Sequence, residues 1–320
     1  MRYNGNMEVC TLTLNPCLDR TLWVEDFGLP PMREEWQTGG KGVNVARVLA
    51  ALGVEARAVC PLGGETGARF LELAKEEGVD VLPVNVPAPT RMIDTWAREG
   101  DFAQRVDYRA GEPLTEEDMD HLEEALFQAL PGARVLAVCG SAPGKAAAGR
   151  VAGILRRAKK MGVATVLDSN GAALLQGVEG LPDLLKPNER ELEALTGSAD
   201  PASAWALLER GVGRVLVSLG ERGCCLVGAD ALGPAELLPL TLGARAEVYA
   251  PAPKGKTVNP VGSGDSFLAA YLYAALRGWP DEQALSLANA AGAANAQMFP
   301  AARVGWKEIQ PLLRGMDEKN

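Results

Sequence analysis

Short apolar runs alternate with amphipathic segments along most of the chain, and this rhythm defines the predicted elements. Strand-like runs lie at 7–14, 56–61, 134–139, 164–168, 184–188, 215–219 and 224–227. Helical patterns lie at 45–52, 66–77, 115–130, 146–161, 189–196 and 281–297, and the apolar run 267–276 is typical of a buried helix. Strands that alternate with helices favour βαβ units, so the pattern predicts an α/β fold with a mostly parallel sheet.

Two parts of the chain depart from this rhythm. The segments 91–97 and 104–108 are both strand-like, and only a charged turn separates them, which predicts a hairpin. A short strand is also expected after Asp19, before the turn at Pro30 and Pro31. Together, these segments, about 20–37 and 90–109, predict a small sheet that stands off the main one as a lid. Since no repeat or linker interrupts the chain, a single domain over 1–320 is expected.

Four polar residues and one glycine stand where several predicted strands end. They are Asp19, Ser141, Asp168, Asn188 and Gly220. Ligands of open parallel sheets bind beyond the carboxyl ends of the strands. The sequence therefore predicts one shared cleft at this edge.

Composition and charge narrow the choice of partner. The chain has 320 residues, 47% of them hydrophobic, and a formal net charge of −9. An acidic protein is poorly suited to nucleic acid or an anionic membrane, so neither is expected as a partner. No apolar run approaches the roughly 20 residues that cross a bilayer, and the first six residues are too short and polar to begin a secretory signal. A cytoplasmic protein is expected.

The cysteines and the single histidine offer little catalytic chemistry. The six cysteines contain no C-x-x-C pair, so buried free thiols are expected. His121 lies in a capped amphipathic helix, at its predicted solvated edge. Because this disfavours Ser-His-Asp, Cys-His and His-rich metal sites, a carboxylate is the expected catalytic base.

The segment Asn259-Pro-Val-Gly-Ser-Gly-Asp265 is the strongest candidate for chemistry. Gly262 and Gly264 allow backbone N–H groups to converge at a helix N-terminus, which favours an anion. Asp265 would be out of place there unless it takes a proton from a nucleophile that attacks a phosphoryl group. The alternative is an ordinary loop in which Asp265 caps the helix. A dinucleotide fingerprint is excluded because Phe267 replaces its third glycine.

A second glycine cluster precedes the helix predicted at 45–52. Its glycines permit close approach of a ligand, while Lys41 and Asn44 supply a cation and an amide. A plain glycine-rich turn is the alternative. A P-loop is excluded at Gly140-Ser-Ala-Pro-Gly-Lys145, since three residues rather than four separate its glycines and Ala146 replaces the Ser or Thr that would bind the metal.

Five motifs, taken in order, resemble those of the PfkB (ribokinase-like) carbohydrate kinases, and most of all the 1-phosphofructokinase and tagatose-6-phosphate kinase branch. They are Asn15-Pro-Cys-Leu-Asp19, Gly39-Gly-Lys-Gly-Val-Asn44, Lys186-Pro-Asn-Glu-Arg-Glu191, Val217-Ser-Leu-Gly220 and Asn259-Pro-Val-Gly-Ser-Gly-Asp265. Their order and spacing match over nearly the whole chain. The resemblance implies a three-layer αβα fold with a small β-sheet lid.

The resemblance also implies a role for each matching residue in a kinase that uses ATP and Mg²⁺. Asp265 would be the base, and the amides of Gly262, Ser263 and Gly264 would form an anion hole. The ATP phosphates and Mg²⁺ would be organised by Asn188 and Glu191. The nucleotide site would contain Ser218, Gly220, Gly223 and Asn289, and the sugar site Asp19, Gly39, Gly40, Lys41 and Asn44.

Departures from the motifs of this branch leave open which molecule accepts the phosphoryl group. Arg91 is a candidate phosphate clamp, but the polar residues expected after it are replaced by Met92, Ile93 and Asp94, and Asp94 adds a negative charge. Arg105 would restore positive charge if it faces the same side. Our leading hypothesis is a ketohexose phosphate of the fructose 1-phosphate or tagatose 6-phosphate type, with an unphosphorylated sugar or nucleoside, or a non-catalytic sugar-phosphate sensor, as alternatives.

Self-association is a further expectation. An exposed sheet edge in the lid favours pairing with a second copy, so the expected form of self-association is a homodimer through the lid strands.

Overall fold

The computed structural model describes residues 7–98, 102–228 and 247–317. A nine-stranded sheet runs through the molecule in the order β13-β12-β11-β10-β9-β8-β1-β4-β5. Seven neighbouring strands are parallel, while β12 and β13 are antiparallel additions at one edge. The strands are β1 (Val9–Thr13), β4 (Ala56–Leu62), β5 (Asp80–Asn85), β8 (Val135–Gly140), β9 (Ala164–Ser169), β10 (Leu184–Leu185), β11 (Arg214–Ser218), β12 (Cys224–Val227) and β13 (Glu247–Ala250).

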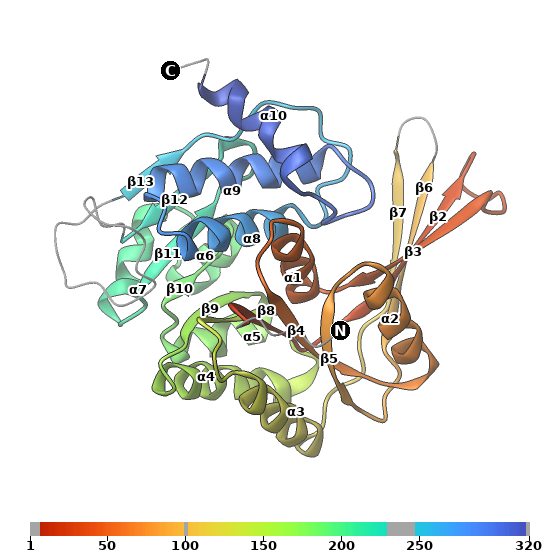
Figure 1. Ribbon diagram of the computed structural model, residues 1–320, viewed down its shortest axis with the longest axis horizontal. Helices are drawn as coiled ribbons and strands as arrows, with labels where there is room; N and C mark the ends of the chain where they lie inside the picture. The colour runs from red at the N-terminus through yellow and green to blue at the C-terminus, as the bar shows by residue number, and fades with distance from the viewer. Residues whose placement is uncertain (1–6, 99–101, 229–246, 318–320) are drawn as a thin grey trace.

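Helices cover both faces of this sheet, and each face has its own apolar core (Figure 1). One core contains side chains of α1 (Lys41–Ala51), α2 (Gly64–Glu76), α8 (Ser263–Leu276), α9 (Asp281–Ala296) and α10 (Trp306–Asp317). The other contains side chains of α3 (Glu116–Ala129), α4 (Gly144–Lys160), α5 (Gly171–Gly177), α6 (Glu189–Thr196) and α7 (Trp205–Glu209). The predicted three-layer αβα fold is confirmed.

A second sheet of four strands projects from one end of the molecule (Figure 1). Its order is β3-β2-β6-β7, formed by β2 (Cys17–Val24), β3 (Arg33–Gly39), β6 (Arg91–Arg98) and β7 (Gln104–Tyr108). It corresponds to the predicted lid, but it begins at Cys17, and the predicted segment 20–37 contains two strands, β2 and β3, where only one was expected. Asp19 therefore lies within β2 and not just past the end of the first strand.

The helices that follow the glycine clusters begin earlier than predicted. α1 begins at Lys41 rather than at position 45, and α8 begins at Ser263 rather than at 267. Glycine has low helix propensity, so the pattern undervalues these first turns. Packing requires the glycine in α1, because a Cβ on Gly42 would lie 2.4 Å from Oγ1 of Thr13.

Several smaller predictions can be compared with the described part of the chain. All six cysteines are free and buried, as expected. His121 is exposed on α3, whose N-terminus has a capping box between Thr115 and Asp118. Within the described residues, no helix combines the length and apolarity needed to cross a bilayer.

Candidate active site

A cleft of about 890 Å³ lies between the lid and the carboxyl ends of the main strands. Because side chains alternate across a strand, every second residue of the lid strands β2, β6 and β7 faces this cleft. On β2 and β6 these residues are Cys17, Asp19, Thr21, Arg91, Ile93 and Thr95. Gln104, Val106 and Tyr108 continue the same face on β7. We call this space the acceptor cleft.

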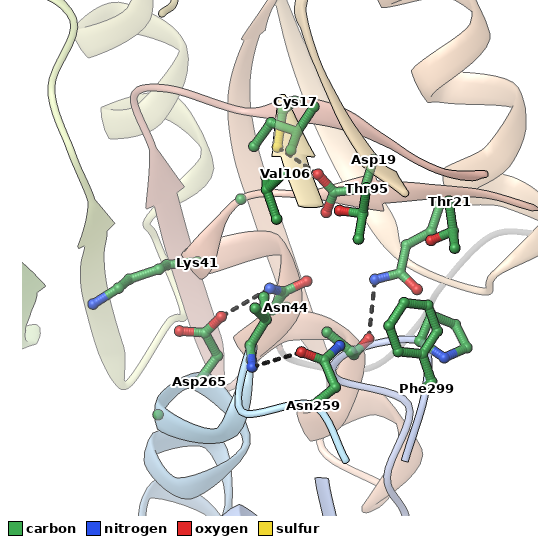
Figure 2. Close-up of a pocket in the computed structure, with 18 of the residues that line it drawn as sticks. Cys17, Asp19, Thr21, Lys41, Asn44, Thr95, Val106, Asn259, Asp265 and Phe299 are labelled. Carbon is green, nitrogen blue, oxygen red and sulfur yellow. Dashed lines mark hydrogen bonds between the residues drawn. The ribbon is translucent and has the colours of Figure 1, made fainter. Parts of the chain in front are cut away.

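Asp265 lies in the first turn of α8 and lines the acceptor cleft. The residue is 5% exposed, and its Oδ2 accepts a hydrogen bond of 2.8 Å from Nδ2 of Asn44 on α1 (Figure 2). Burial raises the pKa of Asp265, while Lys41 and the Asn44 hydrogen bond act in the opposite direction. A buried carboxylate with a raised pKa and one fixed oxygen is suited to accept a proton.

Two lysines converge on a buried carboxylate beside this base. Nζ of Lys41 lies 2.9 Å from Oδ1 of Asp168, and Nζ of Lys186 lies 3.3 Å from Oδ2 of the same side chain. Burial would raise the pKa of Asp168, but the two ammonium groups outweigh it and lower that pKa. Two cations against one carboxylate leave positive charge near Asp265, which suits a phosphoryl group in transfer.

A second cleft of about 900 Å³ adjoins the first. Asn188, Ser218 and Gly264 line both clefts, so these residues mark their junction. The second cleft is also lined by Gly220, Gly223 and Asn289, which the resemblance assigns to a nucleotide site, and by Ser263 of the predicted anion hole. We call it the donor cleft.

The glycines and Asn289 of the donor cleft have structural reasons for their identity. Gly223 has a φ of +98°, and a Cβ there would lie 2.0 Å from the carbonyl oxygen of Ala250. Nδ2 of Asn289 donates to that same carbonyl at 2.9 Å, which ties α9 to the end of β13. Asn289 therefore shapes the wall of the donor cleft through a contact between protein groups.

The predicted anion hole divides between the two clefts. Gly262, which has a φ of +80°, lines the acceptor cleft, and Gly264 lies at the junction. The Ser263 amide already donates to the carbonyl of Pro260 at 3.2 Å. Since first-turn amides lack acceptors within their helix, the N-terminus of α8 still directs donors toward the junction.

Asn188 and Glu191 cap α6 reciprocally. Oδ1 of Asn188 accepts the Glu191 amide at 3.0 Å, and Oε2 of Glu191 accepts the Asn188 amide at 2.8 Å. These bonds form a capping box, which accounts for the Asn-x-x-Glu spacing without a ligand. Both residues nevertheless line the acceptor cleft. Within the described residues, no three His, Cys, Asp or Glu side chains cluster as a metal site of their own.

Arg105 does not face the acceptor cleft, contrary to the sequence-based expectation. Its guanidinium stacks 5.1 Å from the Trp96 ring and lies 3.7 Å from Asp107, on the face opposite the acceptor cleft. Its neighbours Gln104 and Val106 line the cleft instead. Arg105 therefore cannot add positive charge to that cleft.

Asp94 and Met92 also face away from the acceptor cleft. Asp94 is 6% exposed, and Arg20 donates to both of its oxygens at 2.8 Å. Met92 packs against the apolar core. The concern that Asp94 brings negative charge to the acceptor is therefore wrong, because strand alternation turns it outward.

Arg91 does line the acceptor cleft. Its guanidinium donates to the carbonyls of Asn15 at 3.1 Å and Arg109 at 3.3 Å, and it lies over the Tyr108 ring. No carboxylate in the described part of the structure forms an ion pair with it. Ser141 does not line this cleft, in contrast to its predicted role. Its Oγ accepts from Asn15 at 2.9 Å and so supports the loop that holds Arg91.

Asp19 belongs to the lid strand β2, and the glycine cluster joins the lid strand β3 to α1. Gly40 and Lys41 line the acceptor cleft with Asp19, whereas Gly39 packs behind it. A Cβ on Gly39 would lie 2.3 Å from Oδ2 of Asp19, so only glycine fits there. Burial raises the pKa of Asp19 to about 6, against a hydrogen bond of 3.2 Å from the Cys17 thiol.

Several lining residues escaped the sequence reasoning. Phe299 (Figure 2), Ala301 and Arg303 come from the segment after α9. Gln37 joins this segment to the lid by donating to the Ala301 carbonyl at 2.9 Å. Lys186 begins the motif Lys186-Pro-Asn-Glu-Arg-Glu191, but the sequence assigned it no role. The proline that follows it marked a strand end, and the carboxyl-end rule could have added Lys186 to the cleft.

Two clefts that share an anion-binding helix N-terminus, with a buried carboxylate beside it, define a phosphotransferase that acts on a hydroxyl group. Residues 20–303 match the model of the pfkB family of carbohydrate kinases, and the chain belongs to this family. The resemblance deduced from its motifs is thereby confirmed.

Named relatives are similar over most of the chain. The 1-phosphofructokinase of Bacillus subtilis (strain 168) is 32% identical over 298 residues, which are 90% of this chain and 92% of that one. The ATP-dependent 6-phosphofructokinase isozyme 2 of Escherichia coli (strain K12) is 31% identical and covers 82% of this chain and 84% of its own. The crystal structure of phosphofructokinase-2 from Escherichia coli with substrates and products has a TM-score of 0.83 at 28% identity, covering 97% and 99% of the two chains.

Proposed function

We propose that this protein is an ATP- and Mg²⁺-dependent kinase that transfers the γ-phosphoryl group to a hydroxyl of a ketohexose monophosphate. The position of Asp265 carries this proposal. It lines the acceptor cleft, and its chain neighbour Gly264 lines both clefts. A hydroxyl in the first cleft and a phosphoryl group in the second would therefore meet beside a buried base.

The reaction assigns a task to each side chain at the junction. The acceptor hydroxyl gives its proton to Asp265 as its oxygen forms a bond to the γ-phosphorus, and the bond from that phosphorus to the leaving oxygen of ADP breaks. Lys41 and Lys186 would neutralise charge on the transferring group, and the amides at the start of α8 would hold its oxygens. Closure of the lid over the acceptor cleft would exclude competing water.

Arg91 supports an acceptor that already carries a phosphate. Its guanidinium lines the acceptor cleft, where it contacts two carbonyls and the Tyr108 ring, and its buried Nε has no hydrogen-bond partner among the described groups. Arginine binds phosphate oxygens with paired N–H donors. The names of the relatives, 1-phosphofructokinase and 6-phosphofructokinase, are consistent with a ketohexose phosphate.

An ADP-release assay tests the proposed reaction. It would compare fructose 1-phosphate, tagatose 6-phosphate, fructose 6-phosphate, free ketohexoses and nucleosides with Mg·ATP. We expect turnover with at least one ketohexose monophosphate and at least 10-fold lower kcat/KM for the free sugars, since these lack the anion that Arg91 would bind. Turnover with neutral acceptors alone would overturn the phosphosugar assignment, and binding without turnover would indicate a sensor.

The side-chain oxygens of Asn188 and Glu191 are compatible with an Mg²⁺ ion that is bound mainly through ATP. Mg²⁺ is usually held by one or two carboxylates together with substrate phosphates, and here it would neutralise phosphate charge. Glu191 uses Oε2 in the capping box, so its Oε1 would be left to contact the metal shell, whereas Oδ1 of Asn188 is already engaged by the Glu191 amide. Glu191 is therefore the better candidate of the two for contact with the metal shell.

Glu191→Gln is expected to raise the Mg²⁺ concentration required for half-maximal activity by roughly 10- to 100-fold. Glutamine can still close the capping box, so α6 should remain folded. The measurement is ADP release against free Mg²⁺ at fixed ATP. Glu193→Gln, at an exposed position on the same helix, is the matched control. An equal Mg²⁺ requirement in both variants would exclude Glu191 from the metal shell.

Asp19 is expected to make acceptor binding depend on pH. With its pKa raised to about 6, the carboxylate form that accepts hydrogen bonds from sugar hydroxyls predominates above that pH, so KM for the acceptor should rise as the pH falls from 7 to 5. Phosphosugars also titrate near pH 6. Asp19→Asn, which removes only the protein group, should therefore flatten part of the rise. An identical pH profile of KM in the variant would contradict this role.

Self-association through the lid strands stays a prediction. One similar solved structure is an oligomer: the tetrameric inhibited form of phosphofructokinase-2 from Escherichia coli has a TM-score of 0.83 to this chain. The edges of the lid sheet are β3 and β7.

A further inference from the structure

Arg47 is a buried arginine that contacts the partner of the proposed base. It lies three residues after Asn44 on α1 and is 6% exposed. One terminal nitrogen donates to Oδ1 of Asn44 at 2.7 Å. The other donates to Oε2 of Glu77 at 2.9 Å and also to the carbonyl of Thr38. The guanidinium is therefore held on one side and directed at Asn44 on the other.

These contacts determine which way the Asn44 amide faces. A guanidinium has only donors, so the amide must present its oxygen to Arg47. Its nitrogen then faces Asp265, at the observed 2.8 Å. Without Arg47, the amide could rotate by half a turn and bring its oxygen against the carboxylate, where two acceptors would repel each other.

We propose that Arg47 is a positioning residue for phosphoryl transfer, which, anchored by Glu77, orients the Asn44 amide and through it the carboxylate of Asp265. This inference rests on the proposed role of Asp265 as the base. Arg47 does not line either cleft, so it would act without touching the acceptor or ATP. Misplacement of a catalytic group by about 1 Å can cost roughly 100-fold in rate.

Arg47 also has a structural role that any test must separate from positioning. Glu77 accepts from Arg47, from Thr38 and from Arg303 at 3.2 Å, so this group joins α1, the end of β3, the segment after α2 and the segment after α9. Removing one partner of a buried ion pair is strongly destabilising. A lower rate in an Arg47 variant would therefore prove little alone.

A double-mutant cycle between Arg47→Met and Asn44→Ala distinguishes the two roles. If Arg47 acts through the Asn44 amide, Arg47→Met should lower kcat by roughly 10- to 100-fold in the natural background and by less than about twofold in the Asn44→Ala background. Each kcat is divided by the fraction of molecules that bind ATP. An equal loss of kcat in both backgrounds would overturn the proposal.

Arg214→Met is the matched control for the loss of a buried ion pair. Arg214 is 7% exposed and lies 2.8 Å from Asp281; it begins β11, whose opposite end at Ser218 lines the clefts. We expect its Tm to fall and its kcat per folded molecule to stay within about twofold. If Arg47→Met does not fold, Arg47→Met with Glu77→Gln removes both charges of the pair and keeps an acceptor for the Thr38 amide.

The pH profile of kcat gives a second, independent readout. The Asn44 hydrogen bond lowers the pKa of Asp265, and the charged groups that face this carboxylate are Lys41, Lys186 and Asp168. Arg47→Met leaves these three in place, so the acidic limb should move to higher pH through loss of the hydrogen bond, and loss of the Arg47 charge acts in the same direction. An unmoved limb would count against the proposal. Absence of turnover in the unmutated protein would instead contradict the proposed function.

Discussion

Asp265→Asn is expected to lower kcat by roughly 10²- to 10⁴-fold, the range attributed to a general base. The amide nearly preserves the shape of the carboxylate and can still accept the hydrogen bond from Asn44, but it cannot take the hydroxyl proton. Binding of ATP should be unchanged, because Asp265 lines only the acceptor cleft. The measurements are steady-state ADP release and the dissociation constant of ATP.

Asp94→Asn provides the control for this substitution. Asp94 is 6% exposed against 5% for Asp265, so the two carboxylates are equally buried. Asp94 pairs with Arg20 on the outer face of the lid. Its variant should lose stability and keep kcat within a few-fold. Comparable kcat losses in the two variants would show that burial of a carboxylate, and not base catalysis, explains the effect at Asp265.

Arg91→Ala should raise KM for the phosphorylated acceptor by roughly 10- to 100-fold. Hydrogen bonds to a charged group contribute about 1.5–3 kcal/mol, and this variant removes the guanidinium that lines the acceptor cleft. KM for a neutral sugar should change little, since no phosphate contact is lost there. Steady-state kinetics with a ketohexose phosphate and the corresponding free sugar would measure the difference.

Arg105→Ala tests whether the two faces of the lid differ as the structure indicates. Arg105 carries the same charge on the neighbouring strand but contacts Trp96 and Asp107 on the opposite face. Its variant should leave KM for the phosphosugar within about twofold. If Arg105→Ala raised KM as much as Arg91→Ala, the assignment of faces would be wrong. If neither variant did, the acceptor phosphate would bind elsewhere.

Much of the fold could be predicted because local patterns repeat. The alternation of apolar runs with helical patterns indicated the parallel sheet, and a hairpin without an intervening helix indicated the lid. The predicted helix bounds were wrong where tertiary contacts override the helix propensity of the residues. Gly42 lies inside α1 although glycine disfavours helices, because its hydrogen atom leaves room for Thr13. β3 lies within the predicted lid segment but was not predicted as a separate strand, because its charged residues give a weak apolar signal.

The residues themselves identify the family and the candidate base. Five ordered motifs and a carboxylate at a glycine-rich helix start are properties of the linear chain, as are the lack of histidine chemistry and the acidic charge. The direction in which Arg105 and Asp94 point could not be read from it, since the register of β6 and β7 places alternate residues on opposite faces. The sequence also could not predict that Asn44 contacts Asp265, 221 positions away, or that Arg47 contacts Glu77. Such contacts form only when helices and strands pack together. A hydrogen bond needs its two atoms about 3 Å apart, and the number of residues between two positions does not determine that distance.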